Sequence, residues 1–267
     1  MTPRSRFAHV PALEDTGRFL GAGGMWAQLL ELERIEIAAA KANGLSNEEL
    51  ALAHMRAGQL LEERLAEPDG ARRHYESAMS IAPAYRPARD RLERLLHQAG
   101  DRPALQAFYS AELDAAKTPA RRAFLLSVLA QLHAAEEDVG PPIKFLQALQ
   151  LERPDSIGTV QLLARLLAKA GRDVELLAVT DREIKLTRSP ARIAKLLHRA
   201  GELALATGDR ERATGYFRRA LEAVDDHQPA LESLGRVLRD ASDWAGLVEL
   251  LRKELLYAND RGRQASI

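Results

Sequence analysis

Histidine, cysteine and paired carboxylates are the side chains that most often bind metals or carry catalysis, so their spacing is the first question. The chain has seven histidines and no cysteine. Without cysteine there is no disulfide, no thiol nucleophile and no thiolate ligand for zinc. The histidines form no HExxH motif, and no pair of carboxylates is marked out for acid–base work. The sequence therefore predicts no metal, no cofactor and no catalytic residue.

A glycine-rich segment, GAGGMW (21–26), invites comparison with a loop that binds phosphate. Such a loop follows a strand and is followed by lysine and by serine or threonine. Neither the strand nor those residues are present here. The segment is predicted to be a turn between two helices.

The composition predicts an all-α protein. Ala, Leu, Arg and Glu, which dominate the chain, are strong helix formers, and runs of Val, Ile and Thr are missing. The 38 basic and 38 acidic side chains balance, which argues against nucleic-acid binding through overall basicity. The sequence has no signal peptide and no stretch of about 18–20 apolar residues, so we expect no membrane insertion and a cytoplasmic location by default.

Two segments far apart in the chain share His, Pro-Ala-Leu-Glu, Gly-Arg, Leu and Trp at the same positions. Residues 9–26 read HVPALEDTGRFLGAGGMW and residues 227–244 read HQPALESLGRVLRDASDW, with no gap between the copies. Two further copies lie between them, marked by a glutamate that recurs every 71 residues after a first interval of 76. The surplus falls in the polar stretch ANGLSN (42–47), a loop insertion. The recurrent glutamates are Glu36, Glu112, Glu183 and Glu254.

A second type of helical hairpin alternates with this one, and its helix starts recur at the same interval. Thr118 and Ser189 are each a capping hydroxyl followed by proline, and Ser46 begins a capping box. Asp260 falls at the equivalent place once more. The expected hairpins cover residues 9–42, 46–82, 84–116, 118–152, 155–187, 189–224 and 226–258, and residues 259–267 start a further helix.

One hairpin carries a known signature. Its residues Gly201-x-x-Ala204-x-x-x-Gly208-x-x-x-x-Ala213-x-x-x-Phe217-x-x-Ala220-Leu221 resemble the tetratricopeptide repeat (TPR). The hairpin over 46–82 matches in its second half but carries an extra residue in EERLAEP. The alternate hairpins have glutamate where the family usually has alanine. The resemblance implies an α-α superhelix, a solenoid of about seven TPR-like hairpins that forms a single array over 1–267.

In TPR arrays the first helices line a concave groove that takes the ligand, so the resemblance implies one row of groove-facing residues. Four of its seven members are arginines on alternate hairpins, and guanidinium groups suit an acidic peptide because they bind carboxylates bidentately. The alternative is that each arginine pairs with a glutamate of a neighbouring helix, such as Glu14, Glu62 or Glu232. The row consists of Arg18, Gln59, Arg94, Gln131, Arg165, Glu202 and Arg236.

The recurrent glutamates stand on second helices, where packing is normally tight. We expect them to be structural, with Arg56 placed to reach Glu36 and Arg199 placed to reach Glu183. The two tryptophans open second helices and are expected to pack rather than to bind a ligand.

The resemblance implies a non-catalytic scaffold that binds another protein or a peptide. Residues 1–8 and 260–267 look like parts of further helices, and each repeat of a solenoid buries its apolar face only against neighbours. Two alternatives therefore stay open. The array could be a regulatory or assembly module of a larger protein, or it could form a homodimer by stacking its open repeat ends.

Overall fold

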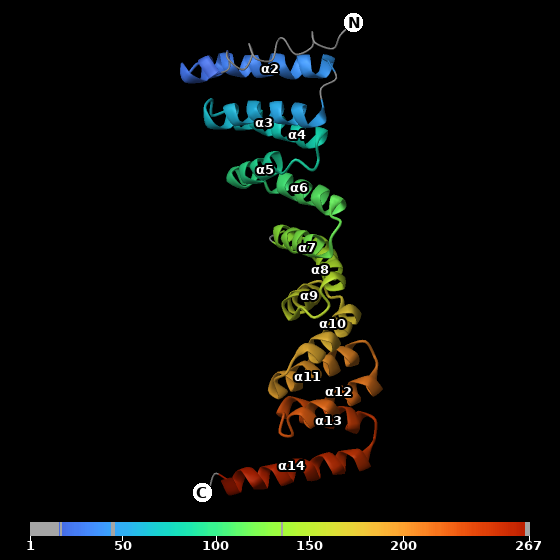
Figure 1. Ribbon diagram of the computed structural model, residues 1–267. Coiled ribbons are helices and arrows are strands. Elements are labelled where there is room, and N and C mark those ends of the chain that lie inside the picture. Colours follow the sequence, from blue (N-terminus) through green and yellow to red (C-terminus); the bar gives the residue numbers. More distant parts are fainter. Residues whose placement is uncertain (1–15, 17, 44–45, 135, 265–267) are drawn as a thin grey trace. The chain divides into compact units, whose positions relative to one another are not determined.

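The computed structural model describes residues 16, 18–43, 46–134 and 136–264, and their side chains except those of 40–43 and 256–264. All regular elements in these residues are α-helices, joined in sequence by short turns, and the predicted all-α hairpin fold is confirmed (Figure 1). The chain divides into two compact units, Met1–Phe108 and Tyr109–Ile267. The single array over residues 1–267 stays a prediction.

The first unit packs consecutive helices against one another: α2 on α3, α3 on α4 and α4 on α5. The border between the units falls within the next helix, α6. The first helix of the first expected hairpin lies largely outside the described residues. The bounds are α2 (Trp26–Asn43), α3 (Asn47–Glu63), α4 (Pro68–Ile81), α5 (Arg86–Ala99) and α6 (Arg102–Ala115).

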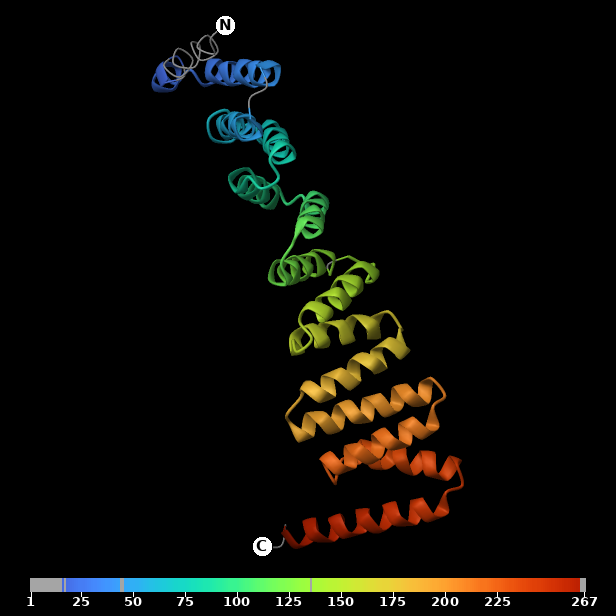
Figure 2. The ribbon, with the colours of Figure 1, turned by 45° about the vertical axis from the view of Figure 1, so that its right-hand side comes forward.

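The second unit continues this pattern from α7 to α14. Figure 2 shows α11 and α12 side by side and antiparallel, and these two helices are in extensive contact. One apolar cluster runs through α7 to α10 and another through α10 to α14. The bounds are α7 (Pro119–His133), α8 (Gly140–Glu152), α9 (Ile157–Lys169), α10 (Asp173–Leu186), α11 (Pro190–Ala206), α12 (Arg210–Ala223), α13 (Gln228–Asp240) and α14 (Trp244–Gln264).

A glycine opposite an aromatic ring fixes the close packing inside two hairpins. A Cβ on Gly58 would lie 2.5 Å from the Tyr75 ring, and one on Gly201 would lie 2.3 Å from the Phe217 ring. The glycine and the ring are separated by one more residue in the first pair, which is the extra residue expected in EERLAEP. The chain accommodates it with Ala66 at a positive φ of 55°.

The predicted helix caps are present in two of three cases. The Ser46 side chain accepts from the Glu49 N–H and the Glu49 carboxylate accepts from the Ser46 N–H, a complete capping box. Thr118 Oγ1 accepts from the Arg121 N–H at 3.3 Å. Ser189 makes no capping bond with its side chain, so the expected hydroxyl cap is wrong there. The following proline has no N–H, and its fixed φ suits a helix start without a side-chain cap.

Two further expectations concern turns. The glycine-rich segment is the predicted turn, with Gly24 at a positive φ of 69° before α2 begins. The further helix expected from residue 259 is not separate, because α14 continues through Asp260 to Gln264. Thr118 and Ser189 precede prolines, which disfavour a helical conformation at the residue before them, and both are extended. Asp260 precedes arginine, so nothing interrupts the helix there.

Candidate functional site

The residues of the predicted groove row from Gln59 to Arg236 all lie on the first helices of their hairpins. Gln59 and Arg94 belong to the first unit, on α3 and α5. The second unit holds Gln131, Arg165, Glu202 and Arg236, on α7, α9, α11 and α13. Arg18, before α2, is helical and exposed. All four arginines are exposed, whereas Gln59 and Glu202 are half-buried.

Two of the four arginines are neutralised within their own unit. Arg94 donates to the Glu62 carboxylate at 3.2 Å, and Glu62 also accepts from Tyr75 Oη at 2.6 Å. Burial and this neighbouring carboxylate both raise the pKa of Tyr75. Arg236 donates to Glu202 at 3.1 Å. These pairs follow the alternative in which arginines meet glutamates of adjacent helices.

Arg165 differs from those two arginines, because it forms no ion pair with any described residue. The row is therefore not a continuous series of free guanidinium groups, and its role as an acidic-peptide site stays a prediction.

Three of the four recurrent glutamates, Glu36, Glu112 and Glu183, form ion pairs between successive hairpins. Glu112 meets Arg121 at 2.9 Å and Glu183 meets Arg192 at 2.9 Å. The expected partner of Glu183 was Arg199, and that expectation is wrong. Each arginine that does pair stands two residues after the proline that starts α7 or α11, so the first turn of the helix carries it to the glutamate. The motif Pro-Ala-Arg, present in both copies, is the sequence signal for this contact.

In the first unit the pairing differs, because the position of α3 equivalent to Arg121 and Arg192 holds Glu49. Arg56 of α3 lies 3.8 Å from Glu36, as expected, and 3.8 Å from Glu33. Glu33 is buried, and one of its carboxylate oxygens has no hydrogen-bond partner. Burial raises the pKa of Glu33 to about 7, while Arg56 lowers it and Glu36 raises it.

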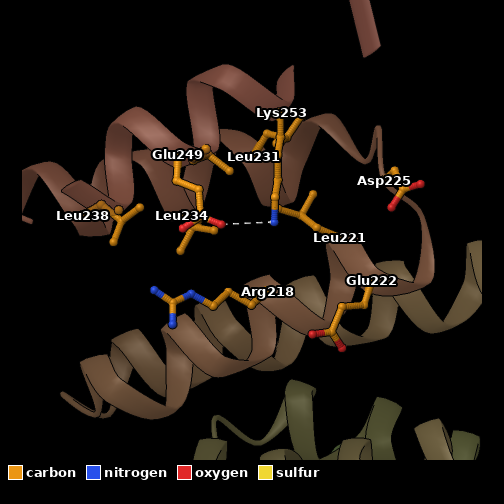
Figure 3. Close-up of a pocket in the computed structure, with 11 residues that line it drawn as sticks. Arg218, Leu221, Glu222, Asp225, Leu231, Leu234, Leu238, Glu249 and Lys253 are labelled. Atoms are coloured by element: carbon orange, nitrogen blue, oxygen red, sulfur yellow. Dashed lines mark ion pairs between the residues drawn. The ribbon is translucent and has the colours of Figure 1, made fainter. Parts of the chain in front are cut away.

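A cleft lies between α12, α13 and α14 in the second unit. Its volume is about 360 Å³. Leucines of α13 and α14 form an apolar floor, and charged side chains stand on the rim (Figure 3). The floor consists of Leu231, Leu234, Leu238 and Leu250, and the rim includes Arg218, Glu222, Glu249 and Lys253.

The neighbouring repeat explains why this cleft is open. One repeat earlier, Gln147 of α8 donates to Glu175 of α10 at 2.8 Å and so ties the two second helices together. The residues 71 positions later are Arg218 and Gly246. Gly246 has no side chain to reach across. A Cβ there would also lie 2.5 Å from the Asp243 carboxylate, which accepts from the Gly246 N–H at 2.9 Å.

Two cations stand on the rim, and among the described residues they differ in whether they form an ion pair. Lys253 lies 3.4 Å from Glu249 on the same helix, an exposed pair that contributes little to stability. Arg218 is exposed and makes no ion pair with any described residue. A carboxylate above the leucine floor would meet this guanidinium. No cleft was predicted here, although Gly246 stands where Glu175 stands one repeat earlier.

The remaining candidates for chemistry give no metal site within the described ranges. No group of three or more histidines and acids there could hold a metal ion. His54 and His74 form a pair with 3.2 Å between their Nδ1 atoms, and the pKa of His74 is lowered mainly by burial. None of the described helices combines the length and apolar character that a membrane span requires.

Among known proteins, the chain is similar to solved structures alone. No family model matches the sequence, and no curated protein matches it either. The chain is similar to the solved structure of YrrB, a TPR protein with an unusual peptide-binding site, at 18% identity and a TM-score of 0.37, covering 73% of this chain and 95% of YrrB.

Two other similar structures are also TPR proteins. The P58(IPK) TPR domain is 17% identical with a TM-score of 0.37, covering 92% of this chain and 68% of that domain. TTC0263 of Thermus thermophilus is 18% identical with a TM-score of 0.31, covering 70% of this chain and 98% of TTC0263. The solved structures to which this chain is similar include TPR proteins, the family that its residues 201–221 resemble.

Proposed function

We propose that this protein is a non-catalytic protein-interaction scaffold whose cleft between α12, α13 and α14 receives apolar side chains from a partner segment. The observation that carries the proposal is the leucine floor of this cleft under a charged rim. Binding sites for peptides combine such apolar pockets with a few polar groups that fix orientation. A segment with an aliphatic residue beside a carboxylate fits best, because Arg218 is available to pair with it.

The predicted row of first-helix residues is a different surface. Leu234 faces the cleft, whereas Arg236, two residues later, lies about 200° further round α13. A partner that enters the cleft therefore does not need the row. Arg165 and Gln131 remain candidates for a second contact.

A displayed library of random short peptides tests the proposal. Peptides are selected on the wild-type chain, and their binding is then measured on a variant with a reversed charge on the rim. We expect the wild-type chain to enrich peptides that pair aliphatic and acidic residues. Arg218→Glu should weaken binding of the selected peptides about tenfold, since an attraction becomes a repulsion. Arg210→Glu is the matched control, because it makes the same change on an exposed part of α12 outside the cleft. Equal losses in the two variants, or no enrichment with the wild type, would contradict the proposal.

A further inference from the structure

Helix α14 carries a row of exposed apolar side chains on one face. Val248, Leu251 and Leu255 are 48%, 51% and 62% exposed, and their spacing places them on the same side of the helix. This apolar row points away from the cleft, because Val248 and the cleft residue Leu250 are about 200° apart round α14. The proposed partner site in the cleft therefore does not depend on it.

The same row is buried at the preceding copy of the repeat. The residues 71 positions earlier, on α10, are Leu177, Thr180 and Ile184, and they are 5%, 1% and 7% exposed. Helix α11 covers them, since its Leu197 and Ala200 belong to the same core cluster as the two aliphatic residues.

The first unit has the same arrangement. On α2 the equivalent positions are Leu30, Glu33 and Ile37, all buried, and α3 packs on that helix. In both units this face of a second helix is covered by the first helix of the following hairpin.

The recurrent glutamate beside the apolar row gives a second indication that this face receives a helix. Glu183 meets Arg192 in the first turn of α11, and Glu112 meets Arg121 in the first turn of α7. Glu254 is the equivalent residue of α14, half-buried and without an ion-pair partner among the described residues. On α14, no helix among the described residues covers the apolar row or pairs with the glutamate, the two elements that receive a helix elsewhere in this chain.

We infer that this face of α14 binds an amphipathic helix of a partner protein, one that carries an arginine in its first turn and an aliphatic and small-residue face like that of α11. Charge complementarity defines the orientation, with the arginine against Glu254 as Arg192 lies against Glu183. A second copy of this chain is a poorer occupant. In its helices α7 and α11 the arginine of the first turn already pairs with the recurrent glutamate of the preceding helix.

A synthetic helix tests the inference directly. The probe is a labelled peptide of residues 187–206, held helical by a lactam bridge between Lys195 and a glutamate introduced as Arg199→Glu, both positions being exposed in α11. We expect saturable binding to the full chain. Leu251→Arg should weaken it at least about tenfold, because it places a charge in the centre of the contact. Leu151→Arg is the control, on an exposed leucine of α8.

Reversing both charges tests the orientation. Glu254→Arg should weaken binding of the probe, and the same probe with Arg192→Glu should restore it on that variant alone. The control is Glu232→Arg, which makes the same charge change at an exposed position of α13. Absence of binding, equal binding to wild type and Leu251→Arg, or failure of the charge swap would overturn the inference. A wild-type dimer that is seen by light scattering and that Leu251→Arg dissociates would also overturn the inference, because a second copy would then occupy this face.

Discussion

Replacing Phe217 by alanine is expected to lower the free energy of unfolding of the second unit by about 3–5 kcal/mol. The ring is fully buried and contacts Gly201 in the paired helix α11. A glycine has no side chain that could move into the space left by the ring. The flanking helices are held by their own neighbours, so the cavity would close only in part.

Urea denaturation followed by circular dichroism measures this effect. Phe124→Ala is the matched control, because Phe124 lies exposed on α7 in the same unit. Its replacement should cost well under half as much. If both variants lose the same stability, the close packing of α11 on α12 is not as described.

Glu33→Gln is expected to remove a pH dependence of stability in the first unit. The pKa of Glu33 is raised by burial from 4.5 to about 7 in the folded state. Because the folded chain holds this proton more tightly, the stabilisation is fully present below pH 4.5 and is lost as the pH rises through 7. The loss is on the order of 3–4 kcal/mol, since the pKa rises by about 2.5 and each pKa unit corresponds to about 1.4 kcal/mol.

The uncharged amide of glutamine does not titrate, so the variant should be more stable than the wild type at pH 8 and close to it at pH 4.5. Measuring both proteins at each pH cancels the contribution of His74, whose lowered pKa acts in the opposite sense. Glu31→Gln, on the exposed side of α2, should leave the pH dependence of the wild type unchanged. A variant at position 33 that keeps the full pH dependence would contradict the assignment.

The 71-residue interval carried most of what the sequence could predict. It indicated the hairpin fold, and it made Glu112 and Glu183 equivalent before their contacts were known. The interval does not identify contact partners, because several arginines lie within reach of each glutamate. Arg192 rather than Arg199 pairs with Glu183, since the first turn of α11 lies against the end of α10.

The cleft was harder to predict, because it arises from a side chain that is absent. Gln147 and Glu175 close the space one repeat earlier, and only a comparison of equivalent positions shows that Gly246 cannot do the same. The expected packing role of Trp244 is also wrong, since its ring is exposed. Its equivalent Trp26 is half-buried, with the Arg64 guanidinium 4.7 Å from the ring centre. The two tryptophans occupy equivalent positions but differ in burial, because Arg64 covers Trp26 and Trp244 is exposed.

Site-specific photo-cross-linking tests the proposed scaffold most directly. A photoreactive amino acid is placed at Glu249, on the rim of the cleft, or at Glu211, an exposed control position of α12 outside it. In cells that produce the chain, we expect a defined protein adduct from position 249 only, with the cross-linked segment holding aliphatic and acidic residues. Arg218→Glu should reduce the yield of this adduct. Equal adducts from both positions, or an adduct that Arg218→Glu leaves unchanged, would contradict a partner site in the cleft.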